Sequence, residues 1–440
     1  MELIAFDAAN AAEALAQLPR TAAVFALYGA DAHAEPYIGR TPNLRGRLER
    51  LLRPSAKYPR RLQLAGRVRR IEWRLTGSEF ESRLLQFDLL QEVYGTKSLE
   101  RMHLRHPAFV RYLGSNPYPR ITVTNRPSQR EAEWAYGPFA SRAAAERYAE
   151  EALKLFLLRR CTDDLDPNPS HPGCVYSEMK MCLAPCYQGC TDERYAEESA
   201  AVESFFATRG EGRLVVLRGE RDKASAELEF EQAAALHAQV QKVESVRALA
   251  SELVRPMSQL RAVILQASAN AGEVAVFLFD GLRFRGPAMF STLGMRIQNE
   301  QSGSTSLFAQ PMALEAVPEM QGLRDQGNEG TGTEGLSPEI RDQSTEPGSA
   351  ASGPARPARG VLEARMEAVL AELTESAGAA DATTRQGHLA LLKGWYYRPE
   401  VRRVGEIFFP DEEGKWPVRA MLRGVGRVAG KMMGASAEKV

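Results

Sequence analysis

Residues 37–52 read YIGRTPNLRGRLERLL, which predicts a short strand, a turn and an apolar helix. Thr41 followed by Pro42 is typical of a helix N-cap with proline at the first helical position. A buried stripe at helical spacing follows, formed by Leu44, Leu48, Leu51 and Leu52. Arg40 and Arg47 lie off that stripe and can reach an anion near the helix N-terminus, where free backbone amides favour negative charge. The segment predicts a unit that binds phosphate. A strand, turn and helix whose basic face is only solvated would have the same spacing.

The charge of the chain is balanced overall but uneven locally. The 440 residues include 56 basic and 56 acidic side chains, yet Arg40–Arg70 holds eleven Lys or Arg and only Glu49 as an acid. Such a block is typical of a surface that binds polyanions, because phosphate contacts give nonspecific affinity for nucleic acids. A solvated face that keeps the domain soluble is the alternative.

No stretch of the sequence predicts a membrane segment. None approaches the roughly eighteen consecutive apolar residues of a membrane span. The N-terminus lacks the basic region and uninterrupted apolar core of a secretory signal. We therefore expect a cytoplasmic protein with no membrane contact.

Five cysteines lie between Cys161 and Cys190, and the rest of the chain has none. In a reducing compartment, clustered thiols are more often metal ligands than disulfides. Twelve, seven and three residues separate the first four of them, which are Cys161, Cys174, Cys182 and Cys186. Four soft thiolates suit an iron-sulfur cluster or structural zinc, with Cys190 spare. A set of small buried thiols is the alternative.

We expect an α+β multidomain chain, since the length suits roughly two or three domains. Its parts are a small α/β domain at 1–112, a strand, helix and cysteine module at 113–191, a helical hairpin at 192–254, a short β-hairpin region at 255–308, a disordered linker at 309–360 and a small α+β tail at 361–440. The linker assignment rests on a composition rich in Gly, Ser, Pro and Glu, which does not support a packed core.

Within these parts, hydrophobic periodicity predicts the individual elements. Strands are expected at 22–28, 36–39, 71–75, 120–124, 261–266, 273–279 and 404–409, and helices at 78–93, 141–158, 361–376 and 384–392. Gly137-Pro138 predicts a turn, and Asp280-Gly281 predicts a β-hairpin.

Several of these features occur in one order that resembles a known family. They are the YIG triplet, Arg47, Gly137–Phe139, the cysteine run and LEFEQAAALHAQV at Leu228–Val240. From about Ala22 to Val254 the chain resembles UvrC, the nuclease subunit of bacterial nucleotide excision repair. The resemblance implies a GIY-YIG nuclease domain, a 4Fe-4S cluster on the four cysteines with zinc as the alternative, and a UVR helical hairpin.

In the GIY-YIG nucleases, a tyrosine acts as general base, an arginine holds the scissile phosphate and a glutamate binds Mg2+ or Mn2+. The resemblance assigns the first two roles to Tyr37 and Arg47, and places Arg40 where the family usually has lysine. Further contacts to DNA are expected from the basic block, at Arg45, Arg50, Arg60 and Arg61.

Two positions depart from the nuclease pattern. Phe25 replaces the tyrosine of the first strand, which removes a hydroxyl, and Gln86 replaces the glutamate of the metal helix. A neutral amide binds Mg2+ far more weakly than a carboxylate does. Four nearby carboxylates are uncertain substitutes, namely Glu79, Glu81, Asp88 and Glu92.

In UvrC, the UVR helix docks on UvrB, a helicase subunit. The resemblance implies that residues 228–240 bind a UvrB-like partner through Leu228, Phe230, Glu231 and Leu236. His237-Ala238 stands where the family commonly has Arg-Asp, so a charge pair that would set partner choice is missing. A helical hairpin that packs only on itself is the alternative.

The resemblance therefore implies a DNA-repair protein that makes one incision on the 3′ side of a lesion if its nuclease site is competent. A catalytically inactive adaptor that binds DNA and docks on a UvrB-like partner is the alternative. The RNase H-like second nuclease domain of UvrC, with its Asp-Asp-His set, is expected to be absent. Residues 422–434, LRGVGRVAGKMMG, are weakly similar to a helix-hairpin-helix.

Overall fold

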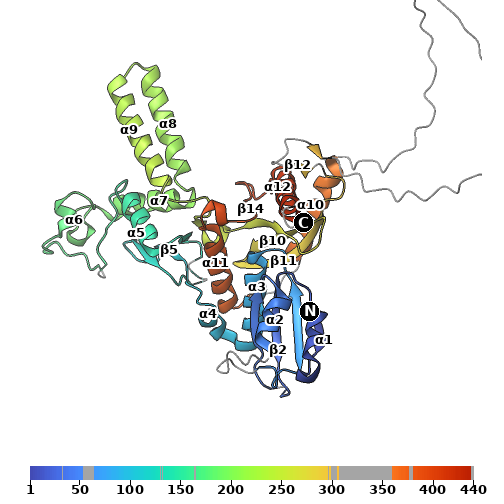
Figure 1. Cartoon of the computed structure of the whole chain (residues 1–440). Coiled ribbons are helices and arrows are strands. Elements are labelled where there is room, and N and C mark those ends of the chain that lie inside the picture. Colours follow the sequence, from blue (N-terminus) through green and yellow to red (C-terminus); the bar gives the residue numbers. More distant parts are fainter. Residues whose placement is uncertain are drawn as a thin grey trace, which may run out of the picture.

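The computed structural model describes residues 1–31, 33–52, 64–128, 130, 132–162, 165–295, 297–298, 305–306, 359–375 and 380–437. Helices and strands are mixed, as predicted, and the described strands include three four-stranded sheets (Figure 1). None of the helices in these ranges is long and apolar enough to cross a bilayer.

The N-terminal sheet has the order β1-β4-β2-β3, and every pairing in it is antiparallel. Its strands are β1 (Glu2–Ala5), β2 (Ala23–Tyr28), β3 (Tyr37–Thr41) and β4 (Arg70–Leu75). The helices α1 (Ala11–Ala16) and α2 (Leu44–Leu52) share one core with this sheet. Because side chains alternate along a strand, the other face of β2 and β3 is left for α3 (Glu79–Tyr94), which packs there.

The start of α2 differs from the prediction. Thr41 is the last residue of β3, and its hydroxyl accepts a hydrogen bond from the Asn43 amide at 3.1 Å. The Asn43 side chain in turn accepts from the Gly46 amide at 2.9 Å, which is the bond expected of an N-cap. Asn43 therefore caps the helix in place of Thr41. The predicted leucine stripe is confirmed, with Leu44, Leu48 and Leu52 fully buried.

The middle unit is a sheet of order β6-β5-β7-β8 with helices against it. Its elements are β5 (Ala108–Tyr112), β6 (Ile121–Thr124), β7 (Ala135–Phe139), β8 (Arg255–Pro256), α5 (Arg142–Leu153) and α7 (Asp192–Ala207). The short helix α4 (Ser98–Arg101) precedes this unit, and the short helix α6 (Val175–Glu178) lies between α5 and α7 in the chain. Strand β5 pairs with β6 and β7, so it belongs to this unit, whereas the predicted boundary at residue 112 assigned it to the first domain. The predicted turn at Gly137-Pro138 is wrong, because both residues lie inside β7.

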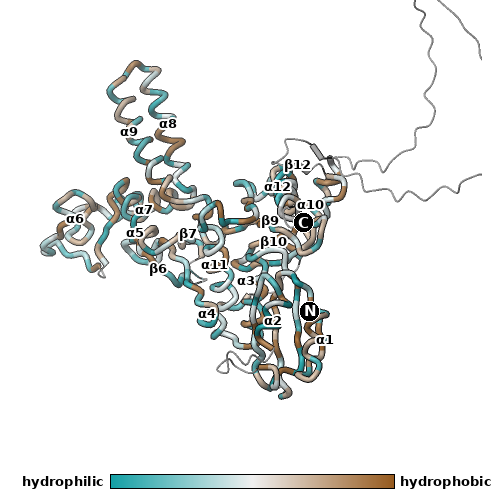
Figure 2. The backbone as a smooth tube through the Cα atoms, viewed as in Figure 1, coloured by the Kyte–Doolittle hydropathy of each residue, from teal (hydrophilic) through white to brown (hydrophobic). Residues whose placement is uncertain are grey.

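The helical hairpin consists of α8 (Glu211–Ala226) and α9 (Phe230–Arg247), and it projects from the middle unit (Figure 1). Its base is anchored in the core of that unit by Leu214, Leu217, Val240, Val243 and Val246. Hydrophilic and hydrophobic residues both occur along the two helices (Figure 2). The helices predicted for residues 192–254 are confirmed, but α7 is part of the core of the middle unit and not of the projecting pair.

The C-terminal unit is a sheet of order β11-β10-β9-β14. Its elements are β9 (Ala262–Ala267), β10 (Glu273–Asp280), β11 (Arg283–Ser291), β14 (Glu406–Phe408), α10 (Arg359–Glu375), α11 (Ala382–Tyr396) and α12 (Val418–Ala437), beside a short ladder of β12 (Ile297–Gln298) and β13 (Thr305–Ser306). The hairpin predicted at Asp280-Gly281 is confirmed by the pairing of β10 with β11.

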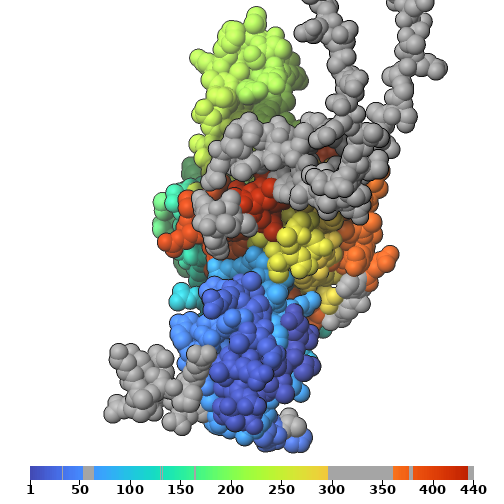
Figure 3. All heavy atoms as spheres, turned by 45° about the vertical axis from the view of Figure 1, so that its right-hand side comes forward, coloured from blue at the N-terminus to red at the C-terminus, as the bar shows by residue number. Residues whose placement is uncertain are grey.

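This sheet joins two parts of the chain that the sequence analysis separated. Strand β14 pairs with β9, so the described residues of the regions 255–308 and 361–440 contribute to one packed unit (Figure 3). The predicted linker at 309–360 lies outside the described residues except for its last two positions, which begin α10. The helix-hairpin-helix similarity at residues 422–434 is not supported, because α12 runs through the Gly424-Val425-Gly426 step as one helix.

Helix α11 lies directly against α3, and a glycine permits the approach. A methyl group added at Gly387 would stand 2.0 Å from the ring of Phe87, which is fully buried. Beside this contact, His388 is hydrogen-bonded to Asp88 at 3.0 Å, and Gln91 donates to Asp381 at 3.0 Å. The N-terminal and C-terminal units therefore meet along two closely packed helices.

We predict that Gly387→Ala destabilises the protein by about 1–3 kcal/mol, the usual cost of overpacking a filled core. Gly394→Ala is the matched control on the same helix, because nothing lies within 4 Å of its added methyl group. It should stabilise by about 0.5–1 kcal/mol, since alanine is the better helix former. Urea unfolding of both variants measures the difference. Equal effects of the two substitutions would contradict the close approach of α11 to α3.

Candidate nucleic-acid interface

Tyr37 begins β3, the edge strand of the N-terminal sheet, and 44% of its surface is exposed. Its ring centroid lies 6.1 Å from that of Phe25 on β2. Phe25 is fully buried and packs over Gly39, where an added methyl group would lie 2.8 Å from the ring. The tyrosine is therefore accessible from solvent, and its neighbour on β2 supplies an apolar face and no hydroxyl.

The arginines of α2 are only partly available to a ligand. The Arg45 Nε donates to the Leu18 carbonyl oxygen at 2.6 Å, which ties α2 to the segment that directly follows α1. The Arg50 Nε donates to the Gly46 carbonyl oxygen at 3.0 Å within the same helix. Arg47 is half-buried on α2, and Arg60 and Arg61 lie outside the described residues. The positive charge of the α2 arginines remains beside β3, where it can act on a polyanion.

Helix α3 holds the predicted metal position, and the structure separates the carboxylates that surround it. Glu81 is buried, and it accepts a hydrogen bond from the Gly77 amide at 2.8 Å as part of the helix N-terminus. Burial raises the pKa of this carboxyl group despite that bond. Asp88 is bonded to His388 on α11. Glu79 shares the face of Gln86, seven residues later, and is the carboxylate that meets Arg40.

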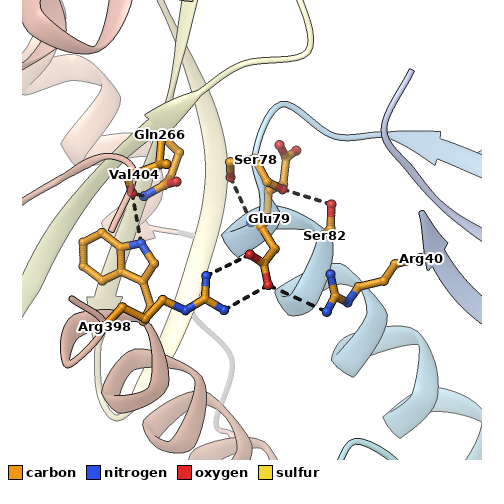
Figure 4. A network of polar contacts seen from close by, with 9 residues as sticks. Arg40, Ser78, Glu79, Ser82, Gln266, Arg398 and Val404 are labelled. Atoms are coloured by element: carbon orange, nitrogen blue, oxygen red, sulfur yellow. Dashed lines mark hydrogen bonds and ion pairs between the residues drawn. The ribbon is translucent and has the colours of Figure 1, made fainter. Parts of the chain in front are cut away.

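Glu79 lies between two arginines from distant parts of the chain (Figure 4). Its Oε1 is 3.7 Å from the Arg40 guanidinium. Both of its oxygens accept hydrogen bonds at 2.9 Å from Arg398, which follows the end of α11. These bonds from Arg398, together with the positive charges of Arg398 and Arg40, lower the pKa of the Glu79 carboxyl group.

The sequence analysis did not find Arg398. It is 319 residues from Glu79 in the chain, and no local pattern connects the two. The segment that carries it, YYRPEVRR at 396–403, contains three arginines, which is the one signal that could have drawn attention to it.

The four predicted ligand cysteines line one pocket in the loop around α6, together with Arg159 and Arg160. Burial raises the pKa of the Cys182 thiol to about 11, and the neighbouring Cys161, Cys174 and Cys186 add to the shift. Cys190 is not among the residues that line this pocket and packs against the core of the middle unit. As the side chains stand, no group of three or more His, Cys, Asp or Glu in the described ranges is arranged to hold a metal ion. The fold thus gathers the thiols into one place.

The tip of the helical hairpin exposes apolar side chains. Leu228 is 70% exposed and adopts a left-handed backbone conformation with φ of 62°, and Phe230 is 66% exposed. Glu231 is exposed as well, whereas Leu236 is partly buried against the core of the middle unit. Three of the four predicted partner-binding residues are therefore accessible.

Comparison with known proteins follows the same division of the chain. Residues 109–205, which run from β5 into α7 and include all five cysteines, match the family described as the UvrC/Cho excinuclease, middle domain. The chain thus contains a domain of the UvrC/Cho excinuclease class.

Other known proteins are similar to a longer part of the chain, about half of its length. UvrABC system protein C of Alcanivorax borkumensis is 28% identical over 211 residues, which are 48% of this chain and 34% of that protein. The protein of that name from Ectopseudomonas mendocina is 28% identical over 224 residues, 51% of this chain and 36% of the relative. The protein of that name from Saccharophagus degradans is 25% identical over 243 residues, which are 55% of this chain and 39% of the relative. No solved structure matches the chain.

The protein is therefore UvrC-like. The match spans only 34% to 39% of the length of these three relatives.

Proposed function

We propose that the protein is a DNA-binding component of nucleotide excision repair, acting as a UvrC-like adaptor that grips DNA without cutting it. The relatives, named as parts of the UvrABC system, support the repair role. The observation that carries the adaptor reading is the Glu79 carboxylate, whose two oxygens are both bonded to Arg398. The carboxylate that shares a face of α3 with Gln86, the predicted metal position, is thus already neutralised.

The charges around Gln86 and Glu79 also favour an adaptor over a nuclease. Gln86 is neutral and offers a divalent cation only a weak ligand. A metal ion at Glu79 would have to displace a bidentate arginine, and it would stand beside a second guanidinium, that of Arg40. Repulsion between like charges opposes that exchange, whereas a DNA phosphate is attracted by the same arginines. The site suits the binding of phosphate better than the binding of Mg2+ or Mn2+.

Single-site incision on the 3′ side of a lesion is the second candidate function. The accessible position of Tyr37 on the edge strand favours it, since a general base must reach the attacking water. In that case Tyr37 would act as base, Arg40 and Arg47 would hold the phosphate, and a divalent ion would supply the Lewis acid. The two candidates differ in one measurable property, which is metal-dependent cleavage.

We predict that the wild-type protein binds a lesion-bearing duplex but does not nick it in Mg2+ or Mn2+. Gln86→Glu supplies the missing carboxylate and is expected to produce metal-dependent nicking, because it restores the ligand that the nuclease family uses. The double variant Gln86→Glu with Tyr37→Phe is the control, and it should bind DNA and remain inactive. Nicking by the wild-type protein that Tyr37→Phe abolishes would reject the adaptor and establish the nuclease.

We further propose that Cys161, Cys174, Cys182 and Cys186 hold a 4Fe-4S cluster, with zinc as the alternative. Their convergence on one pocket supports the assignment, as does the donor set, since four thiolates suit either group. Such a group is expected to order the loop around α6, which has few other long-range contacts to fix it.

Cys182→Ser and Cys174→Ser are predicted to lose the bound metal, because each removes one of four ligands. Cys190→Ser is the matched control and should keep the wild-type content, since this thiol stands apart from the pocket. Iron, sulfide and zinc analysis with visible absorbance after anaerobic purification measures the outcome. Zinc without iron would reject the cluster, and equal metal content in all three variants would reject the site.

We also propose that the tip of the hairpin docks on a UvrB-like helicase subunit. Leu228 and Phe230 are exposed where the two helices join, and burial of such side chains is worth about 1.5–3 kcal/mol each. Apolar anchors of this kind commonly dominate the energy of an interface.

Phe230→Ala is predicted to weaken binding to the UvrB-like subunit by about tenfold or more, equivalent to roughly 1.4 kcal/mol. Val215→Ala serves as the control, because Val215 is also exposed, at 62%, but lies on α8 away from the tip. Titration calorimetry measures both affinities. Equal losses in the two variants, or none, would reject the tip as the docking surface.

A further inference from the structure

We propose that Arg40, Arg83 and Arg398 form a composite site for a DNA backbone phosphate at the junction of the N-terminal and C-terminal units, with Glu79 as its internal counter-ion. The inference rests on the proposed DNA binding and adds a residue from the C-terminal unit to it. It assigns a phosphate ligand to a cluster of charged residues that come from both the N-terminal and the C-terminal units.

Two of the arginines contact one carboxylate, Arg40 from β3 and Arg398 from the segment after α11 (Figure 4). Arg83 lies one helical turn after Glu79 on α3. Arg398 makes two bonds of 2.9 Å to Glu79, and Arg40 approaches it to 3.7 Å. Such a fork of two parallel bonds is the geometry with which arginine also binds phosphate. The Glu79 carboxylate thus occupies the place that a phosphate group would take.

The charges in this cluster do not balance. Arg40 and Arg398 both contact Glu79, and Arg83 lies four residues after it on the same helix, which leaves an excess of positive charge. Burial lowers the pKa of Arg83, and the nearby charges of Arg40 and Arg398 lower it further, so the arginines act on one another. A second anion would relieve this repulsion. The cluster is also open to solvent, with side-chain exposure of 38% for Arg40, 49% for Glu79 and 25% for Arg398.

Rigid packing holds the two halves of the site together. Phe80, next to Glu79, has its ring centroid 5.7 Å from that of Trp395, which lies in the last turn of α11 before Arg398. The Trp395 indole donates to the Val404 carbonyl oxygen at 3.0 Å, and the Gln266 amide donates to the same oxygen at 3.0 Å (Figure 4). The segment that carries Arg398 is therefore fastened to β9. A site on fixed elements loses little entropy when it binds a ligand.

The position of the cluster indicates which anion it takes. Arg40 shares the edge strand with the exposed Tyr37, and the basic block of α2 follows directly in the chain. A polyanion lying along β3 would therefore pass from the α2 arginines to Arg398. Phosphodiesters of a nucleic acid fit this line of charge, because each phosphate can bind arginine in the bidentate mode that Glu79 now uses.

The test uses the full-length protein and an oligonucleotide duplex, with affinity measured by fluorescence anisotropy at several salt concentrations. Glu79→Gln removes the competing carboxylate, so it is expected to tighten binding by about three- to tenfold. Arg398→Gln removes one phosphate contact, so it should weaken binding and reduce the slope of log K against log salt by about 1. Arg398→Lys keeps the positive charge but cannot form two parallel bonds to one phosphate, so its affinity is expected to lie between those of the wild-type protein and Arg398→Gln.

Matched controls change the same charges at another exposed pair, Arg142 and Glu146, which lie 2.7 Å apart on α5. Glu146→Gln and Arg142→Gln report the effect of net charge alone. The site is supported if Glu79→Gln tightens binding well beyond Glu146→Gln. The site is rejected if Glu79→Gln weakens binding or matches its control, since the Arg398–Glu79 ion pair would then only link the two units.

Two outcomes separate this inference from the proposed function. If the wild-type protein binds no DNA at low salt, both fail. If it binds DNA and the site variants behave like their controls, only the composite site fails. Thermal unfolding of every variant identifies any that do not fold, and the sign of the Glu79→Gln effect decides the question if Arg398→Gln is among them.

Discussion

The insertion of α3 into a shared apolar core is the contact on which the arrangement of this chain depends. Phe80, Leu84 and Phe87 recur along one face of α3 and are buried among residues of β9, β10 and α11. Phe80 alone meets three aromatic rings within 5.7 Å, those of Phe277, Phe284 and Trp395. Since each such side chain contributes about 1.5–3 kcal/mol on burial, the contact is worth several kcal/mol. The C-terminal unit is therefore bound firmly to the N-terminal unit.

This core determines how the charged residues at its rim should be interpreted. The pair of Arg398 and Glu79 is partly exposed, and exposed ion pairs stabilise proteins by about 0–1 kcal/mol. The pair is thus not needed to hold the units together, because the apolar contacts beside it already do so. Its main physical effect is on the local electrostatic potential, because it holds the Arg398 guanidinium close to those of Arg40 and Arg83. That is why a role in binding explains the pair better than a role in stability.

Local chemistry could be predicted from the sequence, and contacts between distant residues could not. The helix at 78–93 was predicted and is confirmed as α3 with Ser78 as its cap, since capping is decided within a few residues. The hairpin at Asp280-Gly281 is confirmed for the same reason. The pairing of β9 with β14 was missed, because more than a hundred residues of mixed composition separate the two strands. For the candidate site, the cysteine cluster follows from spacing and Tyr37 from the resemblance to a family, whereas Arg398 depends on the docking of α11.

The charges around α3 bear on both the predicted metal position and the proposed binding of DNA. Gln86 withholds a negative charge from the face of α3, and Arg398 adds a positive charge beside the carboxylate that remains there. Both features make the electrostatic potential along this face of α3 more positive, so both disfavour a divalent cation and favour a phosphate. Arg40 acts in the same direction, because it is always charged and cannot release a proton as a lysine can. Gln86 and Arg40, which both depart from the predicted nuclease pattern, therefore both fit the proposed binding of an anion.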